Sequence, residues 1–271
     1  MPELPEVEST VRFLRERVRG GKVTDVSVLW RNTLVGCSPI QVKRRLRGAT
    51  ISDVTRRGKF ICLSLIDNQN RSKPLCIHLR MSGSLDVFKT ALKPEKHDRV
   101  ILHLKDGRTI RFHDPRKFGR VYFDEAAQRV LLRLGREPLD SDFNEEQLQE
   151  LYRGRKGAIK PLLLNQSILT GLGNIYVDES LWSAGIHPLR PATKIRDSEW
   201  RSLFAAIRTI LSEAIEKQGT DFGDGVVEGG GYSPRIYGRS GEACLKCGTT
   251  IKKIVVGQRG THFCAKCQVR R

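Results

Sequence analysis

The last part of the chain contains four cysteines in two closely spaced pairs, and this pattern limits the folds available to it. Two residues separate the cysteines within each pair and sixteen separate the pairs, which are Cys244 with Cys247 and Cys264 with Cys267. Such pairs supply thiolates from tight turns, and two turns complete a tetrahedron around zinc. Because four thiolates leave no open coordination position, the pattern predicts one structural Zn²⁺. The segment is too short to bury much core, so zinc binding should supply its folding energy.

The residues between the two cysteine pairs predict a hairpin with a basic surface. Ile251–Val256 and Thr261–Phe263 have the composition of two short strands. We expect His262 to lie on the surface, because four cysteines already satisfy the metal. A zinc hairpin this rich in cations favours contact with a phosphate backbone. The cations in and around it are Lys252, Lys253, Arg259, Lys266, Arg270 and Arg271.

The whole chain is also strongly basic. Its 271 residues include 48 Lys and Arg against 30 Asp and Glu, a formal net charge of +18. This charge predicts a polyanion partner, either nucleic acid or an anionic membrane surface. No apolar run approaches the roughly 18 residues of a spanning helix, and the N-terminus lacks a signal-peptide pattern. The remaining cysteines, Cys37, Cys62 and Cys76, are scattered singly, which argues against a disulfide framework. We therefore expect a cytoplasmic protein without a membrane segment.

The first half of the chain reads as a β-rich domain preceded by one helix. Val7, Val11, Leu14 and Val18 recur at helical spacing, and Gly20 and Gly21 end the pattern. Gln41–Leu46 predicts a second, short helix. Residues 1–132 therefore predict a two-layered β-sandwich that carries the N-terminal helix on its edge. The expected strands are Val23–Leu29, Lys59–Ile66, Pro74–Arg80, Val100–Leu104, Arg108–Phe112 and Val121–Phe123.

The pattern changes to helices after Leu134 and Gly135. Asn144, with Gln147 three residues later, resembles a capping box and begins a helix that runs to about Arg153. Residues 219–231 are rich in glycine and predict a loop. The chain is thus expected to be an α+β multidomain protein, with a helical domain over residues 133–232 and the cysteine module over residues 237–271. The further helices expected are Lys160–Ser167, Asn174–Ala184 and Ser198–Lys217.

The first six residues allow two interpretations. Prolines and glutamates suit the first turn of a helix, and this interpretation is favoured by the motif alone. If Met1 is removed, however, the Pro2 nitrogen becomes a secondary amine that can attack an electrophilic carbon and form an iminium. Glu3 and Glu6 are then candidate proton carriers.

Ordered motifs along the whole chain resemble the family of formamidopyrimidine-DNA glycosylases and endonuclease VIII. The resemblance implies a β-sandwich, a helix–two-turn–helix domain and a zinc finger. The motifs are Pro2-Glu3-Leu4-Pro5-Glu6-Val7-Glu8, Arg56-Arg57-Gly58-Lys59-Phe60, His78-Leu79-Arg80-Met81-Ser82-Gly83-Ser84, Pro94-Glu95-Lys96-His97-Asp98, Asp114-Pro115-Arg116-Lys117-Phe118-Gly119, Gly171-Leu172-Gly173-Asn174-Ile175-Tyr176 and the zinc hairpin.

By this resemblance, Pro2 is the nucleophile that displaces a damaged base and forms a Schiff base with the sugar. Glu3 is the general acid/base that opens the sugar ring. Lys59 contacts the target phosphate and serves as a proton donor in β-elimination, whereas Arg259 holds the same region and is associated with δ-elimination. Glu6 matches a carboxylate near the nucleophile and either tunes the amine or caps the helix.

The resemblance also implies which residues handle the DNA. A duplex hides the sugar carbon and the base, so such an enzyme must flip the nucleotide out of the stack. Met81, Arg116 and Phe118 occupy the positions that fill the resulting void. The positions that match phosphate contacts are His97, Arg116, Arg155, Lys160 and Asn174.

The hypothesis is therefore a bifunctional DNA glycosylase and AP lyase that removes oxidised purines from damaged double-stranded DNA during base-excision repair. We expect it to act as a monomer, associated with the nucleoid through DNA. The loop Thr220–Tyr232 is shorter than is usual in members that remove 8-oxoguanine, so an enzyme for oxidised pyrimidines is the first alternative. A non-catalytic protein that binds damaged DNA is the second. A basic zinc-ribbon module for transcription or RNA binding would explain the C-terminus but not the first residues.

Overall fold

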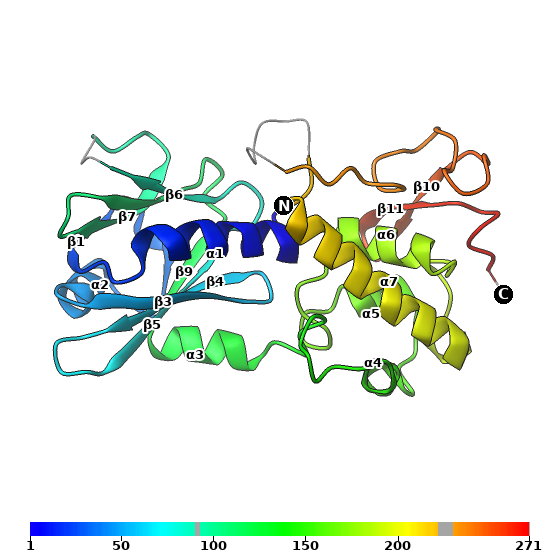
Figure 1. Ribbon diagram of the computed structural model, residues 1–271, viewed down its shortest axis with the longest axis horizontal. Coiled ribbons are helices and arrows are strands. Elements are labelled where there is room, and N and C mark those ends of the chain that lie inside the picture. The colour runs from blue at the N-terminus through cyan, green and yellow to red at the C-terminus, as the bar shows by residue number, and fades with distance from the viewer. Residues whose placement is uncertain (90–92, 222–229, 271) are drawn as a thin grey trace. The chain divides into compact units, whose positions relative to one another are not determined.

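The computed structural model describes residues 1–89, 93–221 and 230–270 (Figure 1). These residues form two compact units. The first unit contains Met1–Pro2 and Glu6–Arg133, and the second contains Glu3–Pro5 and Leu134–Arg271. The chain thus begins in the first unit, contributes three residues to the second, and returns.

The first unit is a β-sandwich of two sheets. One sheet has the strand order β1-β7-β8-β6 and the other β2-β9-β5-β4-β3. The pairing is antiparallel throughout, except that β2 and β9 are parallel. The strands are β1 (Val23–Val28), β2 (Leu34–Val35), β3 (Thr50–Arg57), β4 (Phe60–Ile66), β5 (Ser72–His78), β6 (Ser84–Phe88), β7 (Asp98–Leu104), β8 (Thr109–His113) and β9 (Arg120–Phe123).

Helix α1 (Leu4–Val18) belongs to the core of this sandwich and not only to its edge. The four valine and leucine side chains that predicted it, from Val7 to Val18, are fully buried in the same cluster as the inward residues of both sheets. Helix α2 (Pro39–Leu46) begins at Ser38, whose hydroxyl and whose backbone N–H both bond to Gln41. Helix α3 (Glu125–Leu132) was not predicted and ends the unit.

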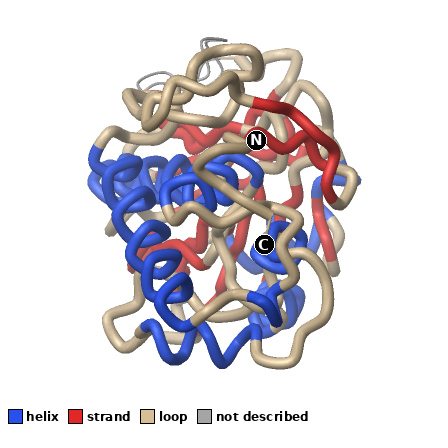
Figure 2. Tube along the Cα trace, turned by 90° about the vertical axis from the view of Figure 1, so that its right-hand side faces the viewer, coloured by secondary structure: helices blue, strands red, loops and turns tan. Residues whose placement is uncertain are grey.

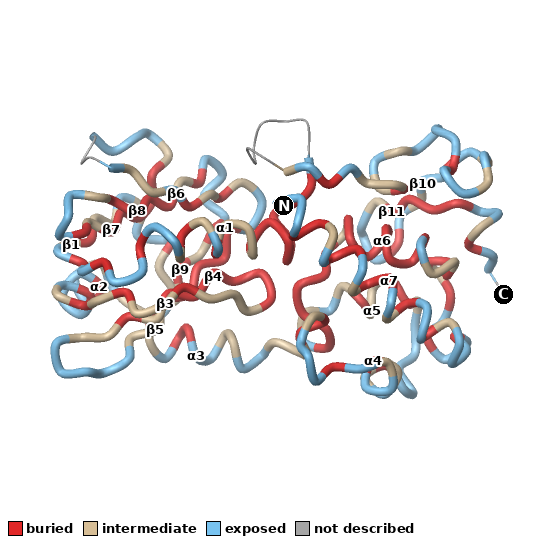
Figure 3. Tube along the Cα trace, in the orientation of Figure 1, coloured by how far each residue is buried: buried red, intermediate tan, exposed pale blue. Residues whose placement is uncertain are grey.

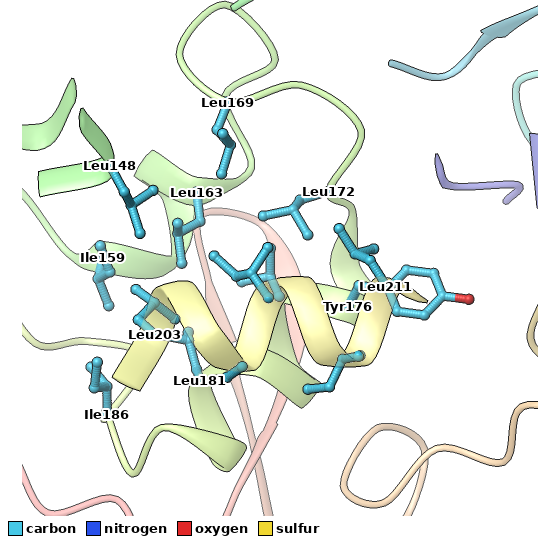
Figure 4. Close-up of a cluster of buried hydrophobic side chains, with 14 of the residues drawn as sticks. Leu148, Ile159, Leu163, Leu169, Leu172, Tyr176, Leu181, Ile186, Leu203 and Leu211 are labelled. Atoms are coloured by element: carbon cyan, nitrogen blue, oxygen red, sulfur yellow. The ribbon is translucent and has the colours of Figure 1, made fainter. Parts of the chain in front are cut away.

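The second unit packs helices around a core of their own. Figure 4 shows side chains from α4 (Glu145–Tyr152), α5 (Ile159–Leu163), α6 (Asn174–Ser183) and α7 (Asp197–Glu216) converging on one cluster. The helices are blue in Figure 2, and the strands β10 (Lys252–Val256) and β11 (Arg259–Phe263) form the predicted antiparallel hairpin. Single 3₁₀ turns lie at Arg31–Thr33 in the first unit and Ala192–Lys194 in the second.

Helix α6 is the centre of the second unit. Every residue from Ile175 to Trp182 is buried, including Asp178 and Glu179, and Figure 3 shows this helix as buried. A helix buried on all sides must satisfy its polar side chains internally. Its two carboxylates therefore mark places where other segments are attached.

No helix in the described ranges is both long enough and apolar enough to span a bilayer.

Candidate functional site

The Glu3 carboxylate binds the N-terminus of helix α6. Its oxygens accept hydrogen bonds from the backbone N–H groups of Gly173 at 2.8 Å, Ile175 at 3.1 Å and Tyr176 at 3.4 Å. The first turn of a helix leaves such donors without partners, and its dipole favours a negative charge there. Gly173 is the N-cap residue and provides no side chain for this purpose, so Glu3 takes that role from 170 residues away.

The two glycines of the Gly171-Leu172-Gly173 turn pack closely against the first residues of the chain. Gly171 has a φ of +92°, and a Cβ there would lie 2.5 Å from Leu4 Cδ1. Its carbonyl accepts a 3.1 Å hydrogen bond from the Leu4 N–H. At Gly173 a Cβ would overlap the Glu3 carboxylate, with Oε2 only 2.7 Å away. Both positions exclude a side chain, so the turn fixes Glu3 and Leu4, and with them the peptide that joins Pro2 to Glu3.

Pro2 is grouped with the first unit and is buried, whereas Met1 is 44% exposed. With Met1 in place the Pro2 nitrogen is an amide and has no nucleophilic lone pair. Removal of Met1 converts it into an amine one residue from the anchored carboxylate. Glu6, also buried, follows in the first turn of α1.

Lys59 lies in a two-residue turn between β3 and β4. Arg57 pairs with Phe60, which leaves Gly58 and Lys59 as the turn, and Gly58 has a φ of +56°. Two-residue hairpins need a left-handed residue here, which glycine supplies without strain. Lys59 is 6% exposed.

The turn that carries Lys59 is tied to helix α1. Arg56 donates from Nε to the Glu8 carboxylate at 3.0 Å and from Nη1 to the Gly58 carbonyl at 3.2 Å. Nearby, burial together with the charges of Arg80 and Lys59 lowers the pKa of His78 to about 3. Its Nδ1 accepts a 3.0 Å hydrogen bond from the Arg80 N–H, as a neutral ring can.

The residues that match void-filling positions lie on exposed loops of the first unit. Met81 is 45% exposed and Phe118 46% exposed. The Arg116 guanidinium lies 5.0 Å from the centre of the Phe118 ring. Half-buried His97 contacts Arg99 at 3.3 Å, and burial followed by the charge of Arg99 lowers the pKa of His97.

Lys160 has a different place from the one that the resemblance implies. Its side chain is 0% exposed, and its Nζ donates to Asp178 Oδ1 at 2.6 Å and to the Gly260 carbonyl at 3.2 Å. Burial lowers the pKa of Lys160, while Asp178 opposes this shift. An amine enclosed in this way offers nothing to a phosphate, so we interpret Lys160 as a structural cation.

Asn174 and Arg259 are brought together by the hairpin. The Asn174 side-chain amide donates to the Gly260 carbonyl at 2.9 Å, and Gly260 follows the exposed Arg259 directly. Asp178 also accepts the backbone N–H of His262 at 2.8 Å. His262 is therefore not a surface residue as expected, since it is 7% exposed and its ring packs on Tyr237.

Arg155 is exposed and lies just after the end of α4. Its guanidinium donates to the Leu151 carbonyl at 2.7 Å.

The ends of the Thr220–Tyr232 loop are fixed to helix α6, although residues 222–229 lie outside the described residues. Thr220 bridges to Tyr232, and its hydroxyl is 2.8 Å from that of Tyr176. Tyr232 donates from its hydroxyl to Glu179 at 3.0 Å. Glu179, the second buried carboxylate of α6, thus holds the C-terminal end of this loop at Tyr232.

The four cysteines of the hairpin module have the spacing of a zinc site. Their sulfur atoms all lie within 4.8 Å of one another. Two of the separations are 3.9 Å, between Cys244 and Cys267, and 3.5 Å, between Cys247 and Cys264. Zn–S bonds of about 2.3 Å in a tetrahedron place sulfurs roughly 3.8 Å apart. The residues present therefore fit the metal.

Three family models match consecutive parts of the chain. They are the formamidopyrimidine-DNA glycosylase N-terminal domain over residues 1–121, the corresponding H2TH domain over residues 134–224, and the zinc finger found in FPG and IleRS over residues 241–269. The chain belongs to the formamidopyrimidine-DNA glycosylase family.

Individual relatives agree with this assignment over the full length. The chain is 44% identical to the formamidopyrimidine-DNA glycosylase of Brevibacillus brevis, covering 99% of each chain. It is 42% identical to that of Xanthomonas euvesicatoria, covering 99% of this chain and 100% of the relative.

Solved structures of DNA complexes are similar in fold. The Lactococcus lactis glycosylase bound to DNA with an AP site has a TM-score of 0.88 at 36% identity, covering 99% of this chain and 100% of that one. A MutM complex with DNA containing carbocyclic 8-oxo-G has a TM-score of 0.89 at 36% identity, with the same coverage.

Within this family fold, the cysteine module is a zinc finger whose four thiolates hold a structural Zn²⁺. Sequence reasoning found those ligands but missed Asp178 and Glu179, which attach the hairpin and the loop to α6. A signal was available, since two adjacent carboxylates inside an otherwise apolar helix indicate buried partners.

Proposed function

We propose that this protein is a bifunctional DNA glycosylase and AP lyase that removes oxidised purines from duplex DNA in base-excision repair. Membership of the glycosylase family supports the reaction class. The observation that carries the chemistry is the Glu3 carboxylate, held by three backbone donors one residue from Pro2. An amine and a fixed carboxylate on adjacent residues are the two groups that Schiff-base formation needs.

In the first step, the Pro2 nitrogen forms a bond to the sugar carbon C1′ and the glycosidic bond breaks. The damaged base leaves with that electron pair. Glu3 takes the proton from the alkylated amine and passes it to the ring oxygen O4′ as the C1′–O4′ bond opens. The product is an iminium between Pro2 and the open sugar, and the carboxylate is regenerated.

Strand cleavage follows from the iminium. A positive nitrogen at C1′ makes the C2′ protons acidic, so loss of one expels the 3′ phosphate by β-elimination. Lys59, from the turn between β3 and β4, is the proposed cation for that phosphate. Arg259, at the exposed end of the zinc hairpin, is proposed to assist the second, δ-elimination. A water nucleophile would give no iminium and no lyase step.

We propose that the remaining matched residues contact the DNA backbone. We also propose that Met81, Arg116 and Phe118 fill the space left by the flipped nucleotide. His97, Arg155 and Asn174 are the proposed phosphate contacts besides Arg116, and Lys160 is not among them. Binding should weaken steeply with added salt, because each neutralised phosphate releases counterions. We further propose that the protein acts as a cytoplasmic monomer with domains over residues 1–132, 133–232 and 237–271.

Borohydride trapping tests the nucleophile. The mature protein should form a covalent adduct with duplex DNA containing 8-oxoguanine, and Pro2→Gly, which replaces the secondary amine with a primary one, should diminish it. Pro5→Ala, which changes the other proline of the same motif, is the matched control and should retain the adduct. An undiminished adduct with Pro2→Gly would refute the role of Pro2. Absence of any adduct in the wild type would refute the enzymatic proposal.

Lesion preference is tested separately, because the central residues of the Thr220–Tyr232 loop lie outside the described residues. Matched duplexes carrying one oxidised purine or one oxidised pyrimidine should be cleaved in favour of the purine. The reverse preference would support the endonuclease VIII-like alternative.

A further inference from the structure

Two of the exposed apolar side chains of the first unit, Met81 and Phe118, lie on loops built in the same way. Met81 follows Arg80, which has a φ of +60°, and Phe118 follows Lys117, which has a φ of +59°. Neither preceding residue is glycine, so each loop holds a left-handed residue at a conformational cost. Such strain persists only where the surroundings fix the loop. The contacts that fix these two loops are shared.

Asp114 binds both loops through one carboxylate. Its Oδ1 accepts a hydrogen bond from the Ser82 hydroxyl at 2.8 Å, one residue after Met81. Its Oδ2 accepts from the Gly119 backbone N–H at 2.7 Å, one residue after Phe118. Asp114 is 1% exposed. Hydrogen bonds to a carboxylate acceptor are among the stronger ones in proteins.

The ring of Phe112, two residues earlier at the end of β8, supports the same two loops. A Cβ at Gly83 would lie 2.9 Å from Phe112 Cε2, and a Cβ at Gly119 would overlap Cζ and lie 3.0 Å from Cε1. Both loops therefore close on one buried ring at glycines. Met81 and Phe118 thus lie on loops with one common support, although they are 37 positions apart in the chain.

The backbone of Asp114 is fixed as well. Its N–H donates to the His97 carbonyl at 2.9 Å, and its own carbonyl accepts from Arg99 Nε at 2.8 Å. If the Asp114 carboxylate moves together with one loop, it therefore displaces the other loop as well.

We propose that Asp114 is a positioning residue that couples the two loops, so that Met81 and Phe118 enter the DNA stack as one unit. This inference rests on the void-filling role given to those side chains under the proposed function. Unstacking a base costs free energy at each step, and two wedges held in register offset that cost together. If Asp114 is lost, each loop can relax its left-handed residue independently.

The first experiment compares base excision with cleavage of a preformed abasic site, using full-length mature protein. Asp114→Ala should slow excision of 8-oxoguanine roughly 10- to 100-fold, the range for losing hydrogen bonds to a buried charged group. Cleavage of the abasic site, which has no base to unstack, should change less than about threefold. Asp114→Asn should restore most of the excision, because an amide can accept from Gly119 and donate to the Ser82 hydroxyl.

Asp106→Ala is the matched control. Asp106 also accepts from a backbone N–H and from an arginine, both of Arg108, but on a turn away from these loops. It should leave both reactions unchanged. Equal losses of excision and abasic-site cleavage in Asp114→Ala, with an unchanged melting temperature, would overturn the coupling.

The second experiment is a double-mutant cycle. In the wild type, Met81→Ala and Phe118→Ala together should slow excision less than the product of the two single effects, whereas in an Asp114→Ala background the effects should multiply. Multiplicative effects in the wild type would overturn the proposal.

Ser82→Ala removes only the hydrogen bond between Asp114 and the Met81 loop. It replaces Asp114→Ala as the test variant if Asp114→Ala does not fold. It should slow excision and leave Met81→Ala with little further effect, and full excision by Ser82→Ala would contradict the coupling. If the wild type forms no borohydride adduct, the proposed function itself is refuted. Failure of the coupling and failure of the proposed function are therefore distinguishable.

Discussion

Replacing Gly173 with alanine should disable the protein without removing any group that the proposed chemistry uses. A Cβ at this position would lie 2.7 Å from Glu3 Oε2 and closer still to Cδ and Oε1, whereas ordinary contact begins at 3.4 Å. The carboxylate must therefore retreat by at least 0.7 Å and, for the nearer atoms, by roughly 1 Å. A retreat of that size stretches the 2.8 Å bond from the Gly173 N–H beyond hydrogen-bonding distance.

The expected magnitude follows from this displacement. Misplacing a reacting group by about 1 Å costs on the order of 100-fold in rate. Glu3 carries the proton from Pro2 to the sugar oxygen in the proposed mechanism, so excision of 8-oxoguanine should slow by about that factor. The protein should remain folded, because alanine is tolerated at the start of a helix at a cost of about 1 kcal/mol.

Single-turnover excision of 8-oxoguanine from a duplex measures the effect, with circular dichroism melting as the check on folding. Ser198→Ala, an exposed change in the first turn of α7, is the control and should leave excision unchanged. Gly173→Ala should also add nothing to Glu3→Gln, because both act on the same carboxylate. Excision by Gly173→Ala within about threefold of wild type, or a fully additive loss with Glu3→Gln, would refute the assigned role of this turn.

Three further predictions concern stability and the metal. Burial lowers the pKa of His78 from 6.5 to about 3, so below pH 6.5 the unfolded chain gains a proton that the folded protein does not. The free energy of unfolding should then fall by about 2 kcal/mol between pH 6.5 and roughly pH 5. In His78→Gln, the free energy measured by urea unfolding should change less over this pH range. Lys160→Met should lower the free energy of unfolding by about 3–5 kcal/mol, since it leaves Asp178 buried without its cation. It should not change the salt slope of DNA binding, and a slope reduced by about one would make Lys160 a phosphate contact after all. Cys244→Ser should release zinc, measured with a colorimetric chelator, and abolish DNA binding, whereas Cys37→Ser should keep both; tight DNA binding by metal-free Cys244→Ser would refute a structural role for zinc.

Elements with strong local signals could be predicted from the sequence. Helix α1 has four apolar residues at helical spacing and glycines at its end, and α4 has a capping box at Asn144 that the structure confirms. The zinc ligands lie in two tight turns, so their spacing alone specified the site. In each case the deciding residues are near neighbours in the chain.

Elements that were missed have irregular local patterns. Strand β3 has a register shift between Ile51 and Asp53, so its buried residues Ile51 and Val54 are three apart and break the alternation expected of a strand. Helix α5 ends at Leu163, short of the predicted Ser167. The Asn165 side chain accepts from the Ser167 N–H and hydroxyl and competes with the helix.

The arrangement of the site depends on contacts that no local pattern reveals. The binding of Glu3 to Gly173 joins residues 170 positions apart. The burial of Lys160 depends on Asp178 and Gly260, so in a chain with a net charge of +18 this lysine could not be told from a phosphate-binding one. Family resemblance supplied the candidate site residues, but only the fold shows which of them are exposed to solvent and which are buried.

The attachment of the first residues to helix α6 also sets an order of events during synthesis. Glu3 leaves the ribosome first, but the backbone donors that hold it are made 170 residues later, roughly 10–30 s at ordinary rates of translation. Throughout that interval Met1 is open to an aminopeptidase, and the nascent chain has no positioned acid/base next to its first proline. Chains stalled before residue 170 should therefore already lack Met1, yet give no borohydride adduct with damaged DNA. We therefore expect the proposed chemistry to begin only after the backbone donors of helix α6 have been made.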